Sequence, residues 1–96
     1  MVGQIVSSNA WKENGALYVT WDEGNGGDYR GLSTTGSITS TGGGGHVLTL
    51  AIEPGIPSGT QLSQPMNHYS LLKTIESNFG VTELGLSANP NLATLP

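Results

Sequence analysis

Apolar residues gather in two short runs that are separated by a long polar stretch. The first run, Ala16–Trp21, is rich in strand-forming residues and is apolar on both faces except at Thr20. The second run, His46–Glu53, is also mainly apolar and is followed by a Pro-Gly pair. Strands that are apolar on both faces usually lie inside a covered sheet. The pattern therefore predicts two buried strands.

A helix is predicted further along the chain, after a second polar stretch. Asn67 can cap free backbone N–H groups at its start, and Gly80 is well placed to end it. Between them, apolar residues at helical spacing predict one apolar face, formed by Leu72, Ile75 and Phe79. The order strand, loop, strand, loop, helix is half of an α/β layer. We therefore expect an incomplete α/β fold.

The stretch between the two runs, Gly24–Gly45, has no hydrophobic period. A loop of this length is uncommon in a compact domain unless it has a function. Its second part, Gly31–Gly45, reads GLSTTGSITSTGGGG and is close to low complexity, so it supplies little apolar surface. We expect this part to be a long Gly/Ser/Thr loop.

Composition and charge exclude several classes of function. The 96 residues include three Lys and Arg, seven Asp and Glu, and no Cys, with a net charge of −4. This balance argues against nucleic-acid binding, because no basic cluster is present to neutralise phosphates. The absence of Cys rules out a disulfide scaffold and thiol chemistry. No apolar run approaches the roughly 18 residues of a membrane span. The weakly charged, Ser/Thr/Gly-rich composition favours a periplasmic or extracellular location for the full-length protein.

The two adjacent acids Asp22 and Glu23 are the main candidates for chemistry. They follow the first apolar run, where ligands bind in open α/β sheets. Neighbouring carboxylates repel each other unless a cation or hydrogen-bond donors offset the repulsion, and oxygen ligands suit hard or borderline divalent metals. The alternative is a turn acid beside a solvated neighbour. The glycines after the pair would allow close approach of backbone to the site.

Three further residues are candidates for contacts with a substrate or with the acid pair. His46 stands at the head of the second predicted strand, and His68 lies in the first turn of the predicted helix. Arg30 could bind an anion such as phosphate. For all three, simple surface exposure or a structural role is the alternative.

The sequence resembles the C-terminal part of the bacterial and fungal phosphoesterase family, which includes phospholipases C and acid phosphatases. The resemblance extends from about Val2 to Ala88. Its most specific part is Asn67–Val81, NHYSLLKTIESNFGV, which is similar to the family's pattern except that Lys73 replaces the usual arginine. The segment Ser8–Lys12 is similar to the family's segment before the strand.

The resemblance implies a metal-dependent hydrolase of phosphate mono- or diesters with an alkaline-phosphatase-like sandwich fold. It implies that Asp22 and Glu23 are metal ligands, with a divalent cation of unspecified identity as cofactor. The family's early Glu-Asn metal motif and its nucleophile belong to an N-terminal part that is not in this chain. We therefore expect residues 1–96 to be the C-terminal portion of a phosphoesterase domain that is inactive alone.

Two other interpretations fit the same sequence. The chain could be a binding or structural remnant of the fold in which the acid pair is merely solvated. It could also be the product of a decayed gene that does not fold alone, because its core is thin. The sequence names neither the substrate nor the metal.

Overall fold

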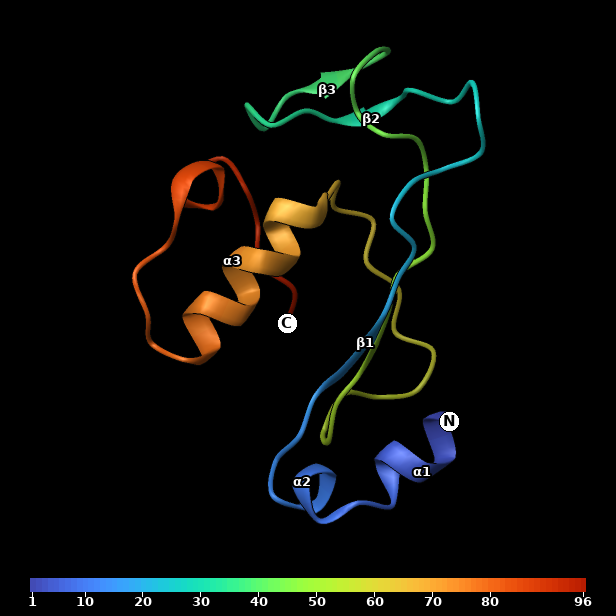
Figure 1. Ribbon diagram of the computed structural model, residues 1–96, viewed down its shortest axis with the longest axis vertical. Helices are drawn as coiled ribbons and strands as arrows, with labels where there is room; N and C mark the ends of the chain where they lie inside the picture. Colours follow the sequence, from blue (N-terminus) through green and yellow to red (C-terminus); the bar gives the residue numbers. More distant parts are fainter. The chain divides into compact units, whose positions relative to one another are not determined.

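The computed structural model describes all residues from Met1 to Pro96 (Figure 1). In chain order the elements are α1 (Val2–Val6), α2 (Asn9–Lys12), β1 (Leu17–Val19), β2 (Gly31–Leu32), β3 (Ile38–Thr39), β4 (Leu50–Ile52), α3 (His68–Asn78) and the 3₁₀ helix η1 (Gly85–Ala88). The mixed α/β class is thus confirmed. The chain forms two units: the first comprises Met1–Trp21 with Leu48–Leu62, and the second comprises Asp22–Val47 with Ser63–Pro96.

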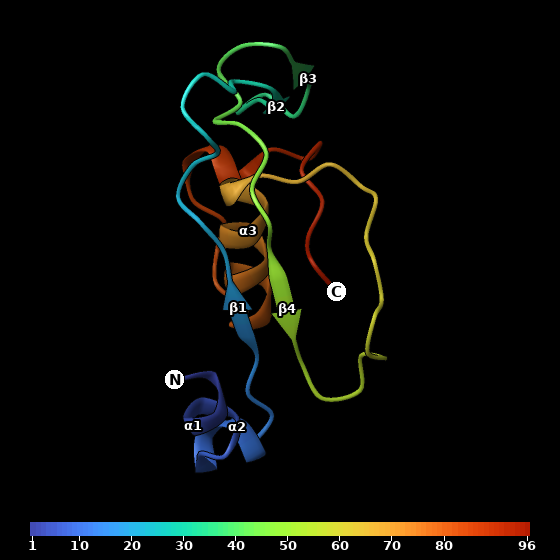
Figure 2. The same cartoon turned by 90° about the vertical axis from the view of Figure 1, so that its right-hand side faces the viewer.

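The first unit is built on an antiparallel ribbon of β1 and β4 (Figure 2). Leu17 lies opposite Ile52, and Val19 lies opposite Leu50. Both strands fall inside the apolar runs from which they were predicted, but the prediction that they are buried is wrong. Every residue of β1 is only half-buried, and Leu50 is 45% exposed. Each strand has a single partner, so each leaves one edge of this two-stranded sheet without a neighbouring strand.

Two polar side-chain contacts cross this ribbon. The hydroxyls of Thr20 and Thr49 lie 2.8 Å apart. The phenol of Tyr18 donates a hydrogen bond to a carboxylate oxygen of Glu53. Partial burial of Tyr18, reinforced by this hydrogen bond and by the negative charge of Glu53, raises the pKa of the phenol to about 12.

The second unit contains a hairpin within the stretch where the sequence predicts only a loop. In this hairpin β2 and β3 pair antiparallel, with Leu32 opposite Ile38. The turn is closed by the N–H of Ser33, which donates to the carbonyl of Ser37 at 2.8 Å. Each strand is only two residues long. Such a strand is too short to produce a hydrophobic period, so no periodic signal for it exists in the sequence.

Helix α3 begins and ends as the sequence predicts. The Asn67 side chain accepts the N–H of Ser70 at 3.0 Å, and the Ser70 hydroxyl accepts the N–H of Asn67 at 3.2 Å, which together form a capping box. The Asn67 amide group also donates to the carbonyls of Leu32 and Ser33, at 3.2 and 3.1 Å. Gly80 follows the helix with a φ of 62°, a left-handed conformation that suits glycine.

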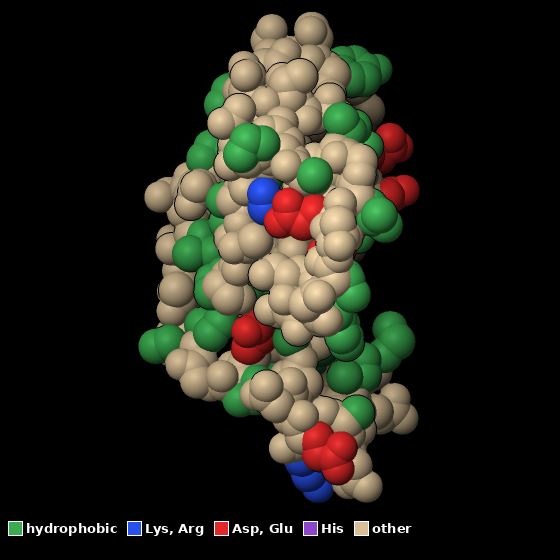
Figure 3. All heavy atoms as spheres, turned by 90° about the vertical axis from the view of Figure 1, so that its left-hand side faces the viewer, with side chains coloured by type: hydrophobic (Ala, Val, Ile, Leu, Met, Phe, Trp, Pro, Cys, Tyr) green, Lys and Arg blue, Asp and Glu red, His purple; other side chains and the backbone are tan.

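Helix α3 buries polar residues and exposes apolar ones, which is the reverse of an ordinary amphipathic helix. Its buried residues are Ser70, Thr74 and Glu76. The apolar residues at helical spacing, Leu72, Ile75 and Phe79, are exposed, and Phe79 is 79% exposed. In the whole chain the buried hydrophobic side chains are Leu32 and Leu92. Hydrophobic atoms accordingly come to the surface at many separate points (Figure 3).

Candidate functional site

The acid pair opens an exposed loop at the start of the second unit, Asp22–Gly27, which we call the acid loop. Three hydrogen bonds hold the backbone of its first three residues. The N–H of Glu23 donates to Oδ1 of Asp22 at 3.1 Å. The N–H of Gly24 donates to the carbonyl of Gly44 at 2.8 Å. The carbonyl oxygen of Asp22 lies 2.8 Å from Nε2 of His68, in the first turn of α3. The two carboxylates therefore project from a backbone that hydrogen bonds hold in place at Asp22, Glu23 and Gly24.

The run of four glycines forms the support on which this loop rests. The N–H of Gly43 donates to the carbonyl of Tyr29 at 2.9 Å, and the N–H of Gly45 donates to the carbonyl of Arg30 at 3.1 Å. A Cβ atom at Gly24 would lie 2.9 Å from the Cα of Gly45, which is closer than real Cβ contacts. Glycine is required here because the two backbone segments touch directly.

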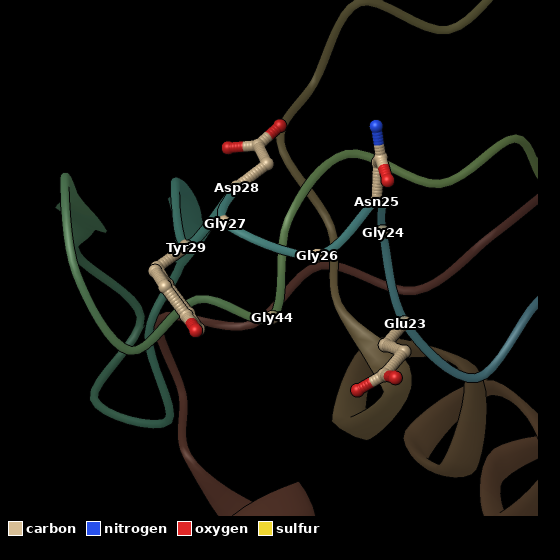
Figure 4. Close-up of a pocket in the computed structure, with 8 residues that line it drawn as sticks. All are labelled: Glu23, Gly24, Asn25, Gly26, Gly27, Asp28, Tyr29 and Gly44. Atoms are coloured by element: carbon tan, nitrogen blue, oxygen red, sulfur yellow. The ribbon is translucent and has the colours of Figure 1, made fainter.

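A small hollow of about 160 Å³ adjoins the acid pair. It is lined by Glu23, Gly24, Asn25, Gly26, Gly27, Asp28, Tyr29 and Gly44. Figure 4 shows the side chains of Asn25 and Asp28 pointing to one side of the glycine backbone, while Glu23 points to the other. Half of the lining residues are glycines, so an incoming group would meet mainly backbone.

Near the acid loop, Asp28 has a cationic partner, whereas Asp22 and Glu23 have none. Arg30 forms an ion pair with Asp28, with Nε 2.9 Å from Oδ1, and a second N–H donates to Oδ2 at 3.1 Å. Hydrogen bonds from the side chain and backbone of Arg30, helped by the backbone N–H of His46, hold the pKa of Asp28 well below its usual range. The same carboxylate raises the pKa of Arg30. The other ion pair of the chain joins Lys73 to Glu83. Neither carboxylate of the acid pair has a cationic partner.

The three other candidate residues lie in different surroundings. His68 is the residue that the fold brings to the acid pair, through its contact with the Asp22 carbonyl. His46 is exposed, and its backbone N–H helps to hold the carboxylate of Asp28. Arg30 is 77% exposed at its side chain and is engaged by Asp28. The contact of His68 spans 46 positions of sequence, so local spacing could not have revealed it.

The chemistry of the acid pair fits a hard or borderline divalent cation, because both side chains offer carboxylate oxygens. No group of three or more His, Asp and Glu side chains in the chain is arranged to hold a metal ion. The pair can therefore supply part of a coordination shell, and water or groups outside this chain would have to complete it.

Comparison with known families identifies the chain. The sequence model of the Phosphoesterase family matches residues 1–82. The chain belongs to the phosphoesterase family. This confirms the resemblance, and the matched residues include the acid pair, the glycine run and all of α3. Phosphoesterase membership implies a phosphate ester as the class of substrate.

No curated protein and no solved structure matches the chain. None of its helices is both long enough and apolar enough to span a membrane.

Proposed function

We propose that this chain provides part of the metal site of a phosphate-ester hydrolase, with Asp22 and Glu23 as carboxylate ligands of a divalent cation. One observation carries the proposal: the pair stands on a hydrogen-bonded backbone without any cationic partner, whereas the nearby Asp28 is neutralised by Arg30. Two adjacent carboxylates without a partner repel each other, and a bound cation would offset that repulsion. The family match to residues 1–82 supports the same conclusion.

The residues of the chain would have distinct tasks in such a site. Asp22 and Glu23 hold the cation and fix its place beside the glycine-lined hollow. Gly26 and Gly27 have no side chains, and the open space beside them leaves room for a substrate to approach the pair. When bound, a divalent cation stabilises negative charge on phosphoryl oxygens and lowers the pKa of a nucleophile that it contacts.

For the complete enzyme we propose an alkaline-phosphatase-like sandwich that hydrolyses phosphate mono- or diesters outside the cytoplasm, as phospholipases C and acid phosphatases do. The nucleophile would come from a part of the domain that precedes residues 1–96. On this proposal the isolated chain binds metal weakly and hydrolyses nothing at an enzymatic rate.

A metal titration of the chain tests the role of the acid pair. Mn²⁺ is added to the wild-type chain, and free Mn²⁺ is measured by electron paramagnetic resonance, with Mg²⁺ as competitor. We expect D22N and E23Q each to weaken Mn²⁺ binding by about tenfold or more. The matched control is E13Q, which removes the same charge at an exposed position of the first unit. Equal affinity in all four proteins would refute the ligand assignment and would favour a non-catalytic remnant of the fold.

A second assay tests the claim that the chain is inactive alone. The chain with saturating Mn²⁺ is incubated with p-nitrophenyl phosphate and with bis(p-nitrophenyl) phosphate. We expect no turnover above that of Mn²⁺ in buffer. Turnover that D22N abolishes would show that the nucleophile lies within residues 1–96 after all.

A further inference from the structure

The contact between His68 and Asp22 has a defined direction. A carbonyl oxygen can only accept a hydrogen bond, so Nε2 of His68 carries a proton and donates it to the oxygen of Asp22 at 2.8 Å. Nε2 is thereby committed to the backbone and is not free to bind a metal. The role of His68 is therefore to be sought in what this hydrogen bond fixes.

The hydrogen bond fixes the peptide that joins the two acids. The carbonyl of this peptide accepts from His68, and its N–H donates to Oδ1 of Asp22. Both polar groups of the peptide plane are thus occupied, and the plane cannot rotate without breaking a bond. The Cα atoms of Asp22 and Glu23 both lie in this plane, so its orientation helps to decide where both side chains point.

The turn that carries His68 is itself well anchored. The preceding residue, Asn67, caps α3 through Ser70 and donates to the carbonyls of Leu32 and Ser33 in the hairpin. His68 therefore reaches the acid loop from a rigid element, while Glu23 has no other side-chain or ion-pair support. A flexible surface residue at this place could not impose an orientation.

We propose that His68 is a positioning residue that orients the carboxylates of Asp22 and Glu23 for the cation by holding the peptide between them. This inference rests on the proposed function of the acid pair. It assigns to His68 no contact with the metal and no contact with substrate. Partners that orient metal ligands in this way typically change metal affinity by about 10- to 100-fold when they are removed.

The test compares H68A and H68Q with N78A in the full chain. Asn78 is exposed at the other end of α3 and serves as the matched control. Two quantities are measured: the order parameter of the Glu23 amide by ¹⁵N relaxation without metal, and Mn²⁺ affinity by electron paramagnetic resonance. We expect H68A to lower the Glu23 order parameter and to weaken Mn²⁺ binding by about tenfold. In H68Q the amide N–H₂ can replace Nε2–H, so we expect affinity within about twofold of wild type, as we do for N78A.

The outcomes separate this inference from the proposed function. If D22N abolishes Mn²⁺ binding but H68A has the affinity and the Glu23 order parameter of wild type, the positioning role is refuted and the ligand assignment stands. If H68A and H68Q both weaken binding only in proportion to lost folding, measured by circular dichroism, the role is structural and the inference is also overturned. If the wild-type chain binds no Mn²⁺, both proposals fall together.

Discussion

The acid loop and the region of α3 and η1 treat their carboxylates in opposite ways. Glu76 of α3 is only 4% exposed, and it accepts the Ser87 hydroxyl at 2.6 Å and the N–H of Leu84 at 3.1 Å. Asp22 and Glu23 are exposed, and the only donor to either carboxylate is the backbone N–H between them. A carboxylate that stabilises the fold, such as Glu76, accepts hydrogen bonds from several donors. The acid pair lacks them, which is why we look for its partner outside the fold.

The cationic side chains also differ between the two regions. Nζ of Lys73 donates to the carbonyl of Asn89 at 2.9 Å and lies 3.6 Å from Glu83, so this lysine holds α3 to the tail of the chain. Beside the acid loop the one nearby cation, Arg30, is taken by Asp28. The negative charge of the acid pair is therefore left unneutralised by the chain. Removing each kind of carboxylate should therefore change the stability of the chain by different amounts.

The largest loss of stability is expected for Glu76→Ala. This change removes the buried carboxylate that accepts the Ser87 hydroxyl and the N–H of Leu84, although Ser87 and Leu84 still hydrogen-bond to each other. A hydrogen bond to a charged group contributes about 1.5 to 3 kcal/mol, so we expect the free energy of unfolding to fall by about 2 to 3 kcal/mol. Urea unfolding followed by circular dichroism measures it. The control is Ser77→Ala, at an exposed position one residue along the helix, which should change little. Equal effects of the two changes would mean that the Glu76 contacts are not used for stability.

A smaller loss is expected for Asn67→Ala, which removes both the cap of α3 and the hydrogen bonds to the hairpin. Loss of a cap costs about 1 kcal/mol, and the bonds to Leu32 and Ser33 add to that, so we expect about 1 to 2 kcal/mol in total. Asn67→Ser retains a capping oxygen but has no amide to reach the hairpin. The difference in unfolding free energy between the two variants isolates the cap. If Asn67→Ser were as damaging as Asn67→Ala, the hairpin contacts alone would account for the role of Asn67.

The parts of the fold that the sequence predicts correctly are those with a local signal. The start and end of α3 follow from the capping side chain of Asn67 and from Gly80, which act within one or two turns of the helix. The two apolar runs locate β1 and β4, but not their exposure, because burial depends on what covers a strand. The same holds for Leu72 and Phe79, whose spacing predicts a helix face but not its exposure.

In the candidate site, too, the sequence predicts the features that have a local signal and misses the others. Adjacent acids followed by glycines are visible in the sequence, so Asp22 and Glu23 can be proposed from it. The support of the loop by Gly43 and Gly45, and the reach of His68 to Asp22, join segments far apart in the chain. Low-complexity sequence carries no sign of such backbone pairing, which is why the glycine run is predicted only as a loop.

The first unit also contains a carboxylate with a hydrogen-bond donor, because the phenol of Tyr18 donates to Glu53. Removing the hydroxyl in Tyr18→Phe should lower the free energy of unfolding by about 1 kcal/mol at neutral pH. Because the pKa of Tyr18 is raised from its ordinary value near 10 to about 12, its stabilising effect is complete below pH 10 and is lost as pH rises toward 12. Urea unfolding at several pH values measures the difference between wild type and variant.

A control and a spectroscopic check accompany this variant. Tyr29→Phe is the control for stability, because Tyr29 is exposed and makes no side-chain hydrogen bond. The absorbance of tyrosinate, titrated in wild type and in Tyr18→Phe, gives a difference curve that should have its midpoint near pH 12. A midpoint near the ordinary value of 10 would show that neither burial nor Glu53 holds the phenol in its neutral form.

The smallest effect on stability is expected where the proposed effect on function is largest. In the double variant D22N/E23Q, the amide oxygen that replaces Oδ1 of Asp22 can still accept the backbone N–H of residue 23, so the backbone of the loop is preserved. The change also removes the repulsion between two exposed charges, which is worth up to about 0.5 kcal/mol. Without metal, we therefore expect unfolding free energy equal to that of wild type or slightly higher. A loss above about 1 kcal/mol, the size of one hydrogen bond, would mean that Asp22 and Glu23 stabilise the fold, as Glu76 does. The acid loop and the region of α3 would then not differ in how they use their carboxylates. Unchanged stability together with weakened Mn²⁺ binding would mean that the pair is kept for a ligand rather than for the fold.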